Sequence, residues 1–399
     1  MAILIDTLLW VILAVLFFNV AYMALYGIAG LFYPKESYPI VANKLKFAVF
    51  IPAYKGDEVI LHTASETLKQ NYPKDKFEVI VIADSLRPET IQTFKSMPLR
   101  VVQVLFENST KGKSLNAAIK AVDGTHYDYA IILDIDNIVE EGFLEKMNSA
   151  LQNNQLVLQA HRLAKNEETK FSVLDGISEE INNQIFRKGH KVLGLSAALI
   201  GSGKAVAYPF FVEIMSNINA VGGFDKQMEV LIISRKVRID YAHEILVYDE
   251  KVQMPEVFQN QRKRWMSAQL TFMRQYALKG IFGSIFTFNI DYLDKSIQLI
   301  LLPRLINVGL NLIFCLVWFI DPIVGRYFIE LFLLQAFILA LCIPKKYFQL
   351  NTLYALMSLP YGFVLMFLNF FKLKGANKKF IHTPHVVAES DKGPNQTKN

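Results

Sequence analysis

The side chains best placed for chemistry are carboxylates that follow short apolar runs. Asp134 and Asp136 come directly after the run Ala130–Leu133, and Asp84 ends an earlier run. In an extended chain, alternation puts Asp134 and Asp136 on the same side. Two carboxylates so spaced can hold Mg²⁺ or Mn²⁺ against a diphosphate, whose oxygens complete the coordination. The spacing therefore predicts a metal site at Asp134 and Asp136, although an Asp-x-Asp also occurs in loops that bind nothing.

Two further segments could contact a nucleotide. A carboxylate at Asp84 can accept hydrogen bonds from a nucleobase or a ribose, and the alternative is an Asp that caps a helix. The segment Lys111-Gly-Lys113 runs into a helical pattern, as do loops that bring a phosphate to a helix N-terminus. It is not a Walker A sequence, because the first glycine is missing at the required spacing.

Alternating strands and helices must position these residues. Strands are predicted at Phe47–Tyr54, Phe77–Asp84, Arg100–Leu105 and Tyr129–Asp134, with helices at Glu58–Gln70 and Ser114–Ala121. This alternation predicts an α/β fold with a mostly parallel sheet. Ligands of open sheets gather at the carboxyl ends of the strands, which is where Tyr54, Asp84 and Asp134 fall.

The composition points to a lipid phase and away from nucleic acid. The 399 residues are too many for one compact core. A mean hydropathy of +0.27 with 52% hydrophobic and 13% aromatic residues is high for a soluble domain. The net charge of +6 suits an anionic membrane face and phosphate-bearing substrates. No basic stripe interleaves with aromatic residues, so we expect no nucleic-acid partner.

The amino-terminal segment predicts a membrane anchor. Asp6 is the single charge between Ile3 and Phe32, and about 20 apolar residues suffice for a span. A signal peptide would want a basic start, a shorter apolar run and a small-residue cleavage site. We therefore expect residues 1–34 to be a retained transmembrane anchor. The lysines at 35, 44 and 46 that follow it place the next domain, residues 47–278, in the cytoplasm.

The chain becomes apolar again from about residue 281. Leu305–Ile320 and Ile323–Ile343 are candidate spans, and Leu350–Phe371 is a third segment of sufficient length. If all three crossed, the lysines behind the third would lie outside the cell, against the positive-inside tendency. We therefore expect that segment to lie in the interface. Residues 281–373 then form transmembrane and interfacial helices, and residues 374–399 a polar cytoplasmic tail.

Two polar residues fall inside the second candidate span. Glu330 and Gln335 could line a path for a polymer or a lipid, because ionisable and polar groups are costly inside a membrane. The alternative for Glu330 is a pair with Arg326, one helical turn away. The two cysteines, Cys315 and Cys342, lie inside apolar runs and imply neither a disulfide framework nor a metal site.

Several motifs, taken in order, resemble those of family 2 glycosyltransferases, in particular the membrane synthases of cellulose, hyaluronan, chitin and poly-N-acetylglucosamine. The motifs are Ile51-Pro-Ala-Tyr54, Val81-Ile-Ala-Asp84, Lys111-Gly-Lys113, Asp134-x-Asp136, Gly201-Ser-Gly203, Gly222-Gly-Phe224 and Gln261-x-x-Arg264-Trp265. The resemblance covers roughly residues 47–270. It implies a GT-A-type fold with helices on both faces of the sheet, and inverting transfer of a sugar from a nucleotide diphosphate, UDP above all.

The resemblance also implies roles for individual residues. The donor-binding set comprises Tyr54, Glu58, Asp84, Lys113, Asp134, Gln261, Arg264 and Trp265. Asp84 would contact the uridine, and Asp134 and Asp136 the nucleotide and its metal. Arg264 would stabilise the departing diphosphate, and Trp265 would offer an apolar face on which a pyranose can stack. These last residues would sit on an interfacial helix at the end of the cytoplasmic domain.

The catalytic base is where the chain departs from the family pattern. The family uses the Asp of a Glu-Asp pair to deprotonate the acceptor hydroxyl, and no Glu-Asp pair occurs here. Counting back from the strand Arg238–Tyr241 favours Asp225 as the base. Counting forward from Gly222-Gly-Phe224 favours Glu229 instead. We prefer Asp225; the alternative is that Asp225 only caps a helix and that the base is absent.

Three functional hypotheses follow from the resemblance. The first is a processive, multi-pass synthase of the cell membrane that extends a polysaccharide. The second is a non-processive transferase that adds one sugar to a lipid acceptor. The third is a non-catalytic membrane subunit with a vestigial site. The expected partners are a nucleotide-sugar donor, a glycan or lipid-linked acceptor and membrane lipid, with an export partner as a further candidate.

Overall fold

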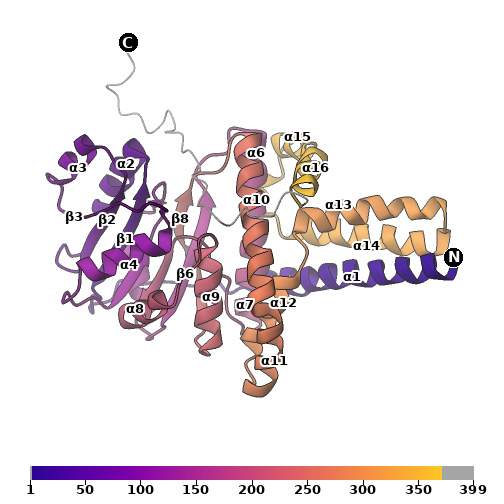
Figure 1. The fold of residues 1–399 in the computed structure, drawn as a ribbon, viewed down its shortest axis with the longest axis horizontal. Helices are drawn as coiled ribbons and strands as arrows, with labels where there is room; N and C mark the ends of the chain where they lie inside the picture. Colours follow the sequence, from indigo (N-terminus) through magenta and orange to yellow (C-terminus); the bar gives the residue numbers. More distant parts are fainter. Residues whose placement is uncertain (1, 371–399) are drawn as a thin grey trace, which may run out of the picture. The chain divides into compact units, whose positions relative to one another are not determined.

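The computed structural model describes residues 2–370, which form two units (Figure 1). The first unit holds the chain up to Pro34, residues 166–197 and the segment from Lys251 to the last described helix. The second holds residues 35–165 and 198–250. Parts of the predicted cytoplasmic domain, 47–278, thus belong to each unit. The assignment of its boundaries to membrane, interface and cytoplasm stays a prediction, and residues 374–399 lie outside the described part.

The second unit is built on one eight-stranded sheet with the order β3-β2-β1-β4-β7-β6-β8-β5. Its strands are β1 (Phe47–Tyr54), β2 (Phe77–Asp84), β3 (Arg100–Val104), β4 (Tyr129–Ile132), β5 (Ile138–Val139), β6 (Val157–Ala164), β7 (Lys204–Ala207) and β8 (Ile239–Asp249). Strands β3, β2, β1 and β4 are parallel neighbours, as are β6 and β8. Strand β7 runs antiparallel to β4 and β6. The predicted α/β fold is confirmed, and the sheet is mixed because β5 also runs antiparallel to its neighbour β8.

Helices cover both faces of this sheet because its central strands are apolar on both sides. On one face, α2 (Asp57–Leu68) and α5 (Phe143–Leu151) share a core with alternate residues of β1 and β2. On the other face, α4 (Lys111–Ala121) packs on β1 to β3, and α8 (Tyr208–Ser216) places Phe211 against Phe50. Helices α3 (Pro88–Phe94) and α9 (Phe224–Ser234) complete the unit.

The first unit is helical. Its elements are α1 (Ala2–Ala29), η1 (Gly30–Phe32), α6 (Lys170–Asn183), the π-helix η2 (Gln184–Gly189), α7 (His190–Val192), α10 (Pro255–Phe272), the π-helix η3 (Met273–Ala277), α11 (Leu278–Thr287), α12 (Ile290–Ile300), α13 (Arg304–Phe314), η4 (Cys315–Phe319), α14 (Pro322–Leu341), η5 (Lys345–Tyr347), α15 (Leu350–Leu356) and α16 (Leu359–Phe370). Helix α1 packs along α14, and α14 packs against α13 (Figure 1).

The first unit contains two helices that are long and apolar enough to span a membrane, at Ile3–Phe32 and Pro322–Leu341. A third span would require the pair Ile290–Ile300 and Arg304–Phe319, which is bent by 56°. The last apolar segment is broken between α15 and α16 into helices of 7 and 12 residues, each shorter than the roughly 20 residues that a span needs. Its interfacial placement stays a prediction.

The two polar residues of the second candidate span have partners within the unit. Glu330 accepts a hydrogen bond from Arg326 Nε at 2.7 Å, as in the alternative interpretation above. Gln335 is buried and bonds to Asn307 and Asn311 of α13 at 2.6 and 2.7 Å. Gln335 therefore ties α14 to α13.

Candidate active site

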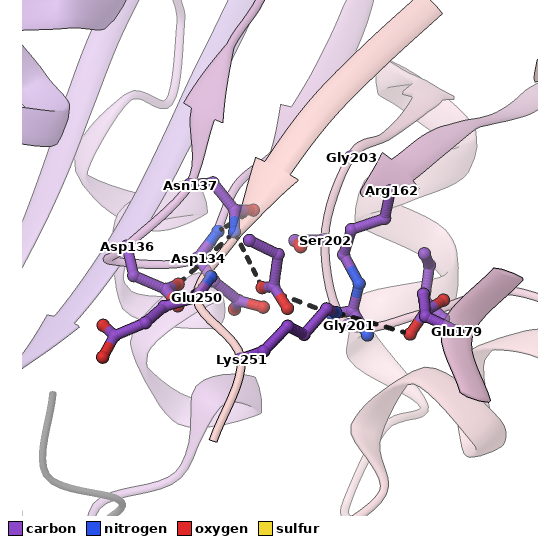
Figure 2. A network of polar contacts seen from close by, with 12 residues as sticks. Asp134, Asp136, Asn137, Arg162, Glu179, Gly201, Ser202, Gly203, Glu250 and Lys251 are labelled. Carbon is purple, nitrogen blue, oxygen red and sulfur yellow. Dashed lines mark hydrogen bonds and ion pairs between the residues drawn. The ribbon is translucent and has the colours of Figure 1, made fainter. Parts of the chain in front are cut away.

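A short loop after β4 presents the two carboxylates of the Asp-x-Asp motif (Figure 2). Asn137, which is fully buried, accepts the backbone N–H of Asp134 at 2.9 Å and donates to Asp249 at 3.0 Å. Asp136 accepts the backbone N–H of Glu250 at 3.2 Å. The end of β8 and the residue after it therefore hold this loop in place, so that the sheet determines the position of both carboxylates.

Lys111 lies directly on Asp134. The side chain of Thr110 caps α4, so that the helix begins at Lys111. The ammonium of Lys111 donates to Asp134 Oδ1 and, at 2.7 Å, to the carbonyl of Gly201. Burial alone would raise the pKa of Asp134, but the charge and hydrogen bond of Lys111 outweigh it and lower that pKa to about 2. Asp134 is therefore ionised at any physiological pH.

A second lysine, Lys204, begins β7 behind the same turn. Its side chain is fully buried, and its ammonium donates to the carbonyls of Ile200 at 2.8 Å and Gly201 at 3.4 Å. The ammonium also lies 4.9 Å from the ring centroid of Phe224. Burial, followed by the charge of Lys111, lowers the pKa of Lys204 to about 7. The site thus contains a second lysine whose protonation near pH 7 depends on the charged groups around it.

The turn Gly201–Gly203 can lie close to Asp134 and to the two lysines because two of its three residues are glycines. Gly203 has φ +67°, a conformation that favours glycine. A Cβ added at Gly201 would lie 3.2 Å from Asp134 Oδ2, so a side chain there would press on the carboxylate. Ser202 Oγ is buried, and no partner for it exists among the described residues.

The structure places both candidate bases near Lys204. The charges of Asp225 and Glu229 both raise the pKa of Lys204 against the lowering by burial. Asp225 is half-buried in the first turn of α9. Glu229 is 1% exposed and accepts the backbone N–H of Leu199 at 3.2 Å. Accessibility favours Asp225 for a role that requires contact with substrate.

The nucleotide-binding residues predicted at the ends of β1 and β2 lie beside each other. Tyr54 is paired in register with Asp84. Asp84 is 1% exposed; its Oδ1 accepts from Ser85 Oγ at 3.0 Å, whereas its Oδ2 is buried without a partner among the described residues. A buried acceptor that lacks a donor costs free energy and is suited to a ligand N–H or O–H.

Other predicted donor residues are exposed or lie in the other unit. Glu58 is exposed in α2, and Lys113 is exposed and donates to the carbonyl of Asn108 at 2.8 Å. Within the predicted segment Lys111-Gly-Lys113, the residue that contacts Asp134 is Lys111, whereas the donor-binding role was predicted for Lys113; the place of Lys111 in that segment was the available signal. Gln261, Arg264 and Trp265 lie on α10 in the first unit.

Within α10, these three residues differ in environment. Gln261 Oε1 is buried, and the described residues offer it no partner. Burial lowers the pKa of Arg264. Trp265 keeps 38% of its surface exposed. A buried amide, a shielded cation and an open aromatic face are groups that can bind a polar ligand with a flat apolar surface.

A divalent cation fits Asp134 and Asp136 only with help from a ligand. Within residues 2–370, no cluster of three or more His, Cys, Asp or Glu side chains is arranged to hold a metal ion. Mg²⁺ is usually held by one or two carboxylates together with substrate phosphates. The two carboxylates supply oxygen ligands of the required kind, and a diphosphate would have to supply the others.

Comparison with known proteins gives a consistent picture. Residues 44–268 match the family model described as "Glycosyltransferase like family 2". The poly(ribitol-phosphate) β-N-acetylglucosaminyltransferase TarS of Staphylococcus aureus is 28% identical over 105 residues, 25% of this chain and 18% of TarS. The UDP-forming cellulose synthase catalytic subunit of Komagataeibacter sucrofermentans is 33% identical over 100 residues, 24% of this chain and 13% of that protein. The chain thus spans less than a fifth of these relatives.

One solved structure resembles the fold over most of the chain. It is the mannosyltransferase PcManGT from Pyrobaculum calidifontis, in complex with GDP-Man and Mn²⁺. The TM-score is 0.51 at 13% identity, and the match covers 84% of this chain and 96% of that one. At this identity the likeness concerns the fold alone.

Proposed function

Because this chain belongs to glycosyltransferase family 2, we propose that it transfers a sugar, with inversion, from a nucleotide diphosphate sugar to a glycan acceptor at a membrane surface. The observation that carries the proposal is the ionised Asp134 at the end of β4, with Lys111 on it and Lys204 and Asp225 close by. Such a group of charges suits a diphosphate that acquires negative charge as it leaves.

The donor is proposed to be a UDP-sugar. The cellulose synthase relative is named as UDP-forming, and the Asp84 carboxylate offers a buried acceptor oxygen for a nucleobase or ribose. Tyr54, paired in register with Asp84, would cover the same part of the nucleotide. Lys111 would turn from Asp134 toward the diphosphate, since both are anions within reach of one flexible side chain.

Asp134 and Asp136 would hold Mg²⁺ or Mn²⁺. A divalent cation, when bound there, neutralises charge on the diphosphate. PcManGT was solved with Mn²⁺, which supports the choice of ion. The hydrogen bond from the Asp134 backbone N–H to the Asn137 side chain and the bond from the Glu250 backbone N–H to Asp136 would keep both carboxylates in place before the donor arrives.

Asp225 is the proposed general base. It would take the proton of the acceptor hydroxyl while that oxygen forms a bond to the anomeric carbon and the bond from this carbon to the diphosphate breaks. The leaving diphosphate keeps the electron pair, and Lys111 would stabilise its charge. Glu229 is the weaker candidate, because its carboxylate is buried and accepts a backbone N–H.

The acceptor is proposed to be a growing polysaccharide, and the enzyme a multi-pass protein of the cell membrane with its catalytic unit in the cytoplasm. The two apolar helices at Ile3–Phe32 and Pro322–Leu341 support the membrane location. A second candidate function is the transfer of one sugar to a lipid acceptor. It requires the same donor site and no path across the membrane.

The test is a panel of nucleotide sugars incubated with membranes that contain the chain, with nucleotide release and product size as readouts. We expect one UDP-sugar to give a polymer, and membranes with Asp134→Asn to give none. A product with a single sugar on lipid would establish the second candidate. No release of nucleotide from any donor, with Mn²⁺ present, would overturn the proposal in favour of a non-catalytic subunit.

A further inference from the structure

Helix α10 carries a row of stacked side chains that the proposed mechanism does not use. Phe258, Arg262 and Trp265 follow one another at spacings of four and three residues, so they share one face of the helix. The guanidinium carbon of Arg262 lies 4.7 Å from the ring centroid of Phe258 and 4.4 Å from that of Trp265. Arg262 is therefore held between two aromatic rings.

A buried carboxylate completes this arrangement. Asp175 of α6 accepts a hydrogen bond from Arg262 Nη2, and the two side chains are only 8% and 12% exposed. Arg262 Nε has no partner among the described residues. The carboxylate and the two rings therefore fix the plane of the guanidinium, since few other groups compete for it.

The consequence concerns Trp265. This ring is 38% exposed, and an exposed tryptophan without a neighbour would populate several rotamers. The guanidinium covers part of the ring and favours one orientation through a cation–π contact. The remaining surface is open. A pyranose that stacks on a ring gains most when the ring is already oriented, because no rotamer entropy is then lost on binding.

We infer that Arg262 is a positioning residue for acceptor binding: anchored by Asp175, it holds the Trp265 ring with its open face toward the acceptor sugar. The role in binding the acceptor sugar rests on the proposed function. The fixed orientation of the Trp265 ring does not, so the two claims can be tested separately.

The ring is tested by fluorescence. The chain has three tryptophans, so replacing Trp10 and Trp318 by Phe leaves Trp265 as the single emitter. In this background we expect Arg262→Met to lower the fluorescence anisotropy of Trp265 in the full-length, detergent-solubilised protein. Arg262→Lys keeps the charge for Asp175 but lacks the planar guanidinium, so it should fold and still show lowered anisotropy. Lys263→Met removes a neighbouring charge from the same helix and should leave the anisotropy unchanged.

The sugar is tested by kinetics with cellotetraose and chitotetraose as acceptor probes. We expect Arg262→Lys to raise the acceptor KM by about fivefold, because an ammonium cannot stack flat on the Trp265 ring as the guanidinium does. The donor KM and the release of nucleotide without acceptor should not change. Unchanged anisotropy in both Arg262 variants would overturn the positioning role. Full activity of Trp265→Ala would instead overturn the acceptor role of the ring and leave the proposed sugar transfer intact.

Discussion

At the scale of single residues, the site is defined by how two lysines share one carbonyl. Lys111 and Lys204 both donate to the carbonyl of Gly201, at 2.7 and 3.4 Å. Lys111 also holds Asp134, whereas Lys204 is shut off from solvent. Lys111, together with the protonated fraction of Lys204, makes the local potential more positive before any ligand is present. A diphosphate anion would bind more favourably in this potential because the charged groups are in place before it arrives, which is electrostatic preorganisation.

The choice between the two candidate bases is open to direct test. We expect Asp225→Asn to lower the transfer rate by about 10²–10⁴-fold, because the amide cannot accept the hydroxyl proton. Nucleotide binding, measured by titration with UDP, should remain. Glu229→Gln is the matched control; it keeps a carbonyl oxygen for the backbone N–H of Leu199 and should retain most activity. Full activity of Asp225→Asn would refute the assignment.

Lys204 should make stability depend on pH. Burial lowers its pKa from 10.5 to about 7, so between these values the unfolded chain binds more protons at this residue than the folded chain. Its contribution to the free energy of unfolding therefore rises with pH across that window. We expect Lys204→Met to show a smaller increase in thermal midpoint than the parent between about pH 7 and pH 9.

The control for this measurement is Lys120→Met, which removes an exposed lysine of α4 from the same unit. It should keep the pH dependence of the parent. If Lys204→Met also kept the pH dependence of the parent, Lys204 would have to stay protonated over the whole pH range measured. Its lowered pKa would then be refuted.

At the scale of elements, β1 and β2 were predictable to the residue, whereas β4 ends at Ile132 and not at the predicted Asp134, and the start of α4 was not predicted correctly. The predicted bounds of β1 and β2 agree with the structure, because both are continuous apolar runs buried on two faces. The helix predicted from Ser114 begins at Lys111 instead, since Thr110 provides the cap. That shift of three residues places Lys111 at the carboxylate and leaves Lys113 in solvent.

Strand β7 was not predicted from the sequence, for a physical reason. It has four residues and begins with a buried lysine, so neither alternation nor an apolar run marks it. Its place between β4 and β6 comes from antiparallel pairing with both, which only the folded sheet reveals. The site residue Lys204 was missed together with the strand that carries it.

A buried polar cluster should hold helix α1 to the rest of the first unit. Asp294 of α12 accepts hydrogen bonds from Tyr22 at 2.7 Å and Tyr26 at 2.8 Å, and lies 3.1 Å from His190 Nε2. Asp294→Leu would leave these donors buried without their acceptor. We expect a loss of about 3 kcal/mol, as when one partner of a buried pair is removed, measured by thermal unfolding in detergent.

Glu213→Gln provides the comparison, because Glu213 pairs with Arg235 on the surface, where its side chain is 56% exposed. Its removal should cost under about 1 kcal/mol. Equal losses of stability in the two variants would show that the Asp294 cluster does not hold α1 to the other helices.

At the scale of the whole molecule, the segment 47–278, which the sequence predicts to be one cytoplasmic domain, contributes residues to both units. Helix α6 is one of its parts that belong to the first unit. Its carboxylates Asp175, Glu179 and Glu180 suggest a solvated surface, yet all three are buried. Asp175 pairs with Arg262, and Glu179 pairs with Arg187. Glu179 also lies 3.8 Å from the ammonium of Lys251, and Figure 2 shows this pair. Charges buried by mutual pairing carry no periodic signature, so composition assigns them to the surface.

The proposed membrane topology makes a prediction about the whole chain. If the amino terminus is outside and the catalytic unit is cytoplasmic, cysteines introduced in the two places should react from opposite sides of the membrane. Replacing the native Cys315 and Cys342 by Ala gives a background without thiols. Ile3→Cys and Lys120→Cys then each place one thiol at an exposed position.

We expect an impermeant maleimide to label Ile3→Cys in intact cells and Lys120→Cys only after the membrane is opened. The physical reason is that α1 is long enough to cross once, and the basic residues that follow it are retained on the cytoplasmic side. Labelling of Lys120→Cys in intact cells would place the sheet and its site outside. Cytoplasmic nucleotide sugars could not reach it there, and the proposed donor would have to be abandoned together with the topology.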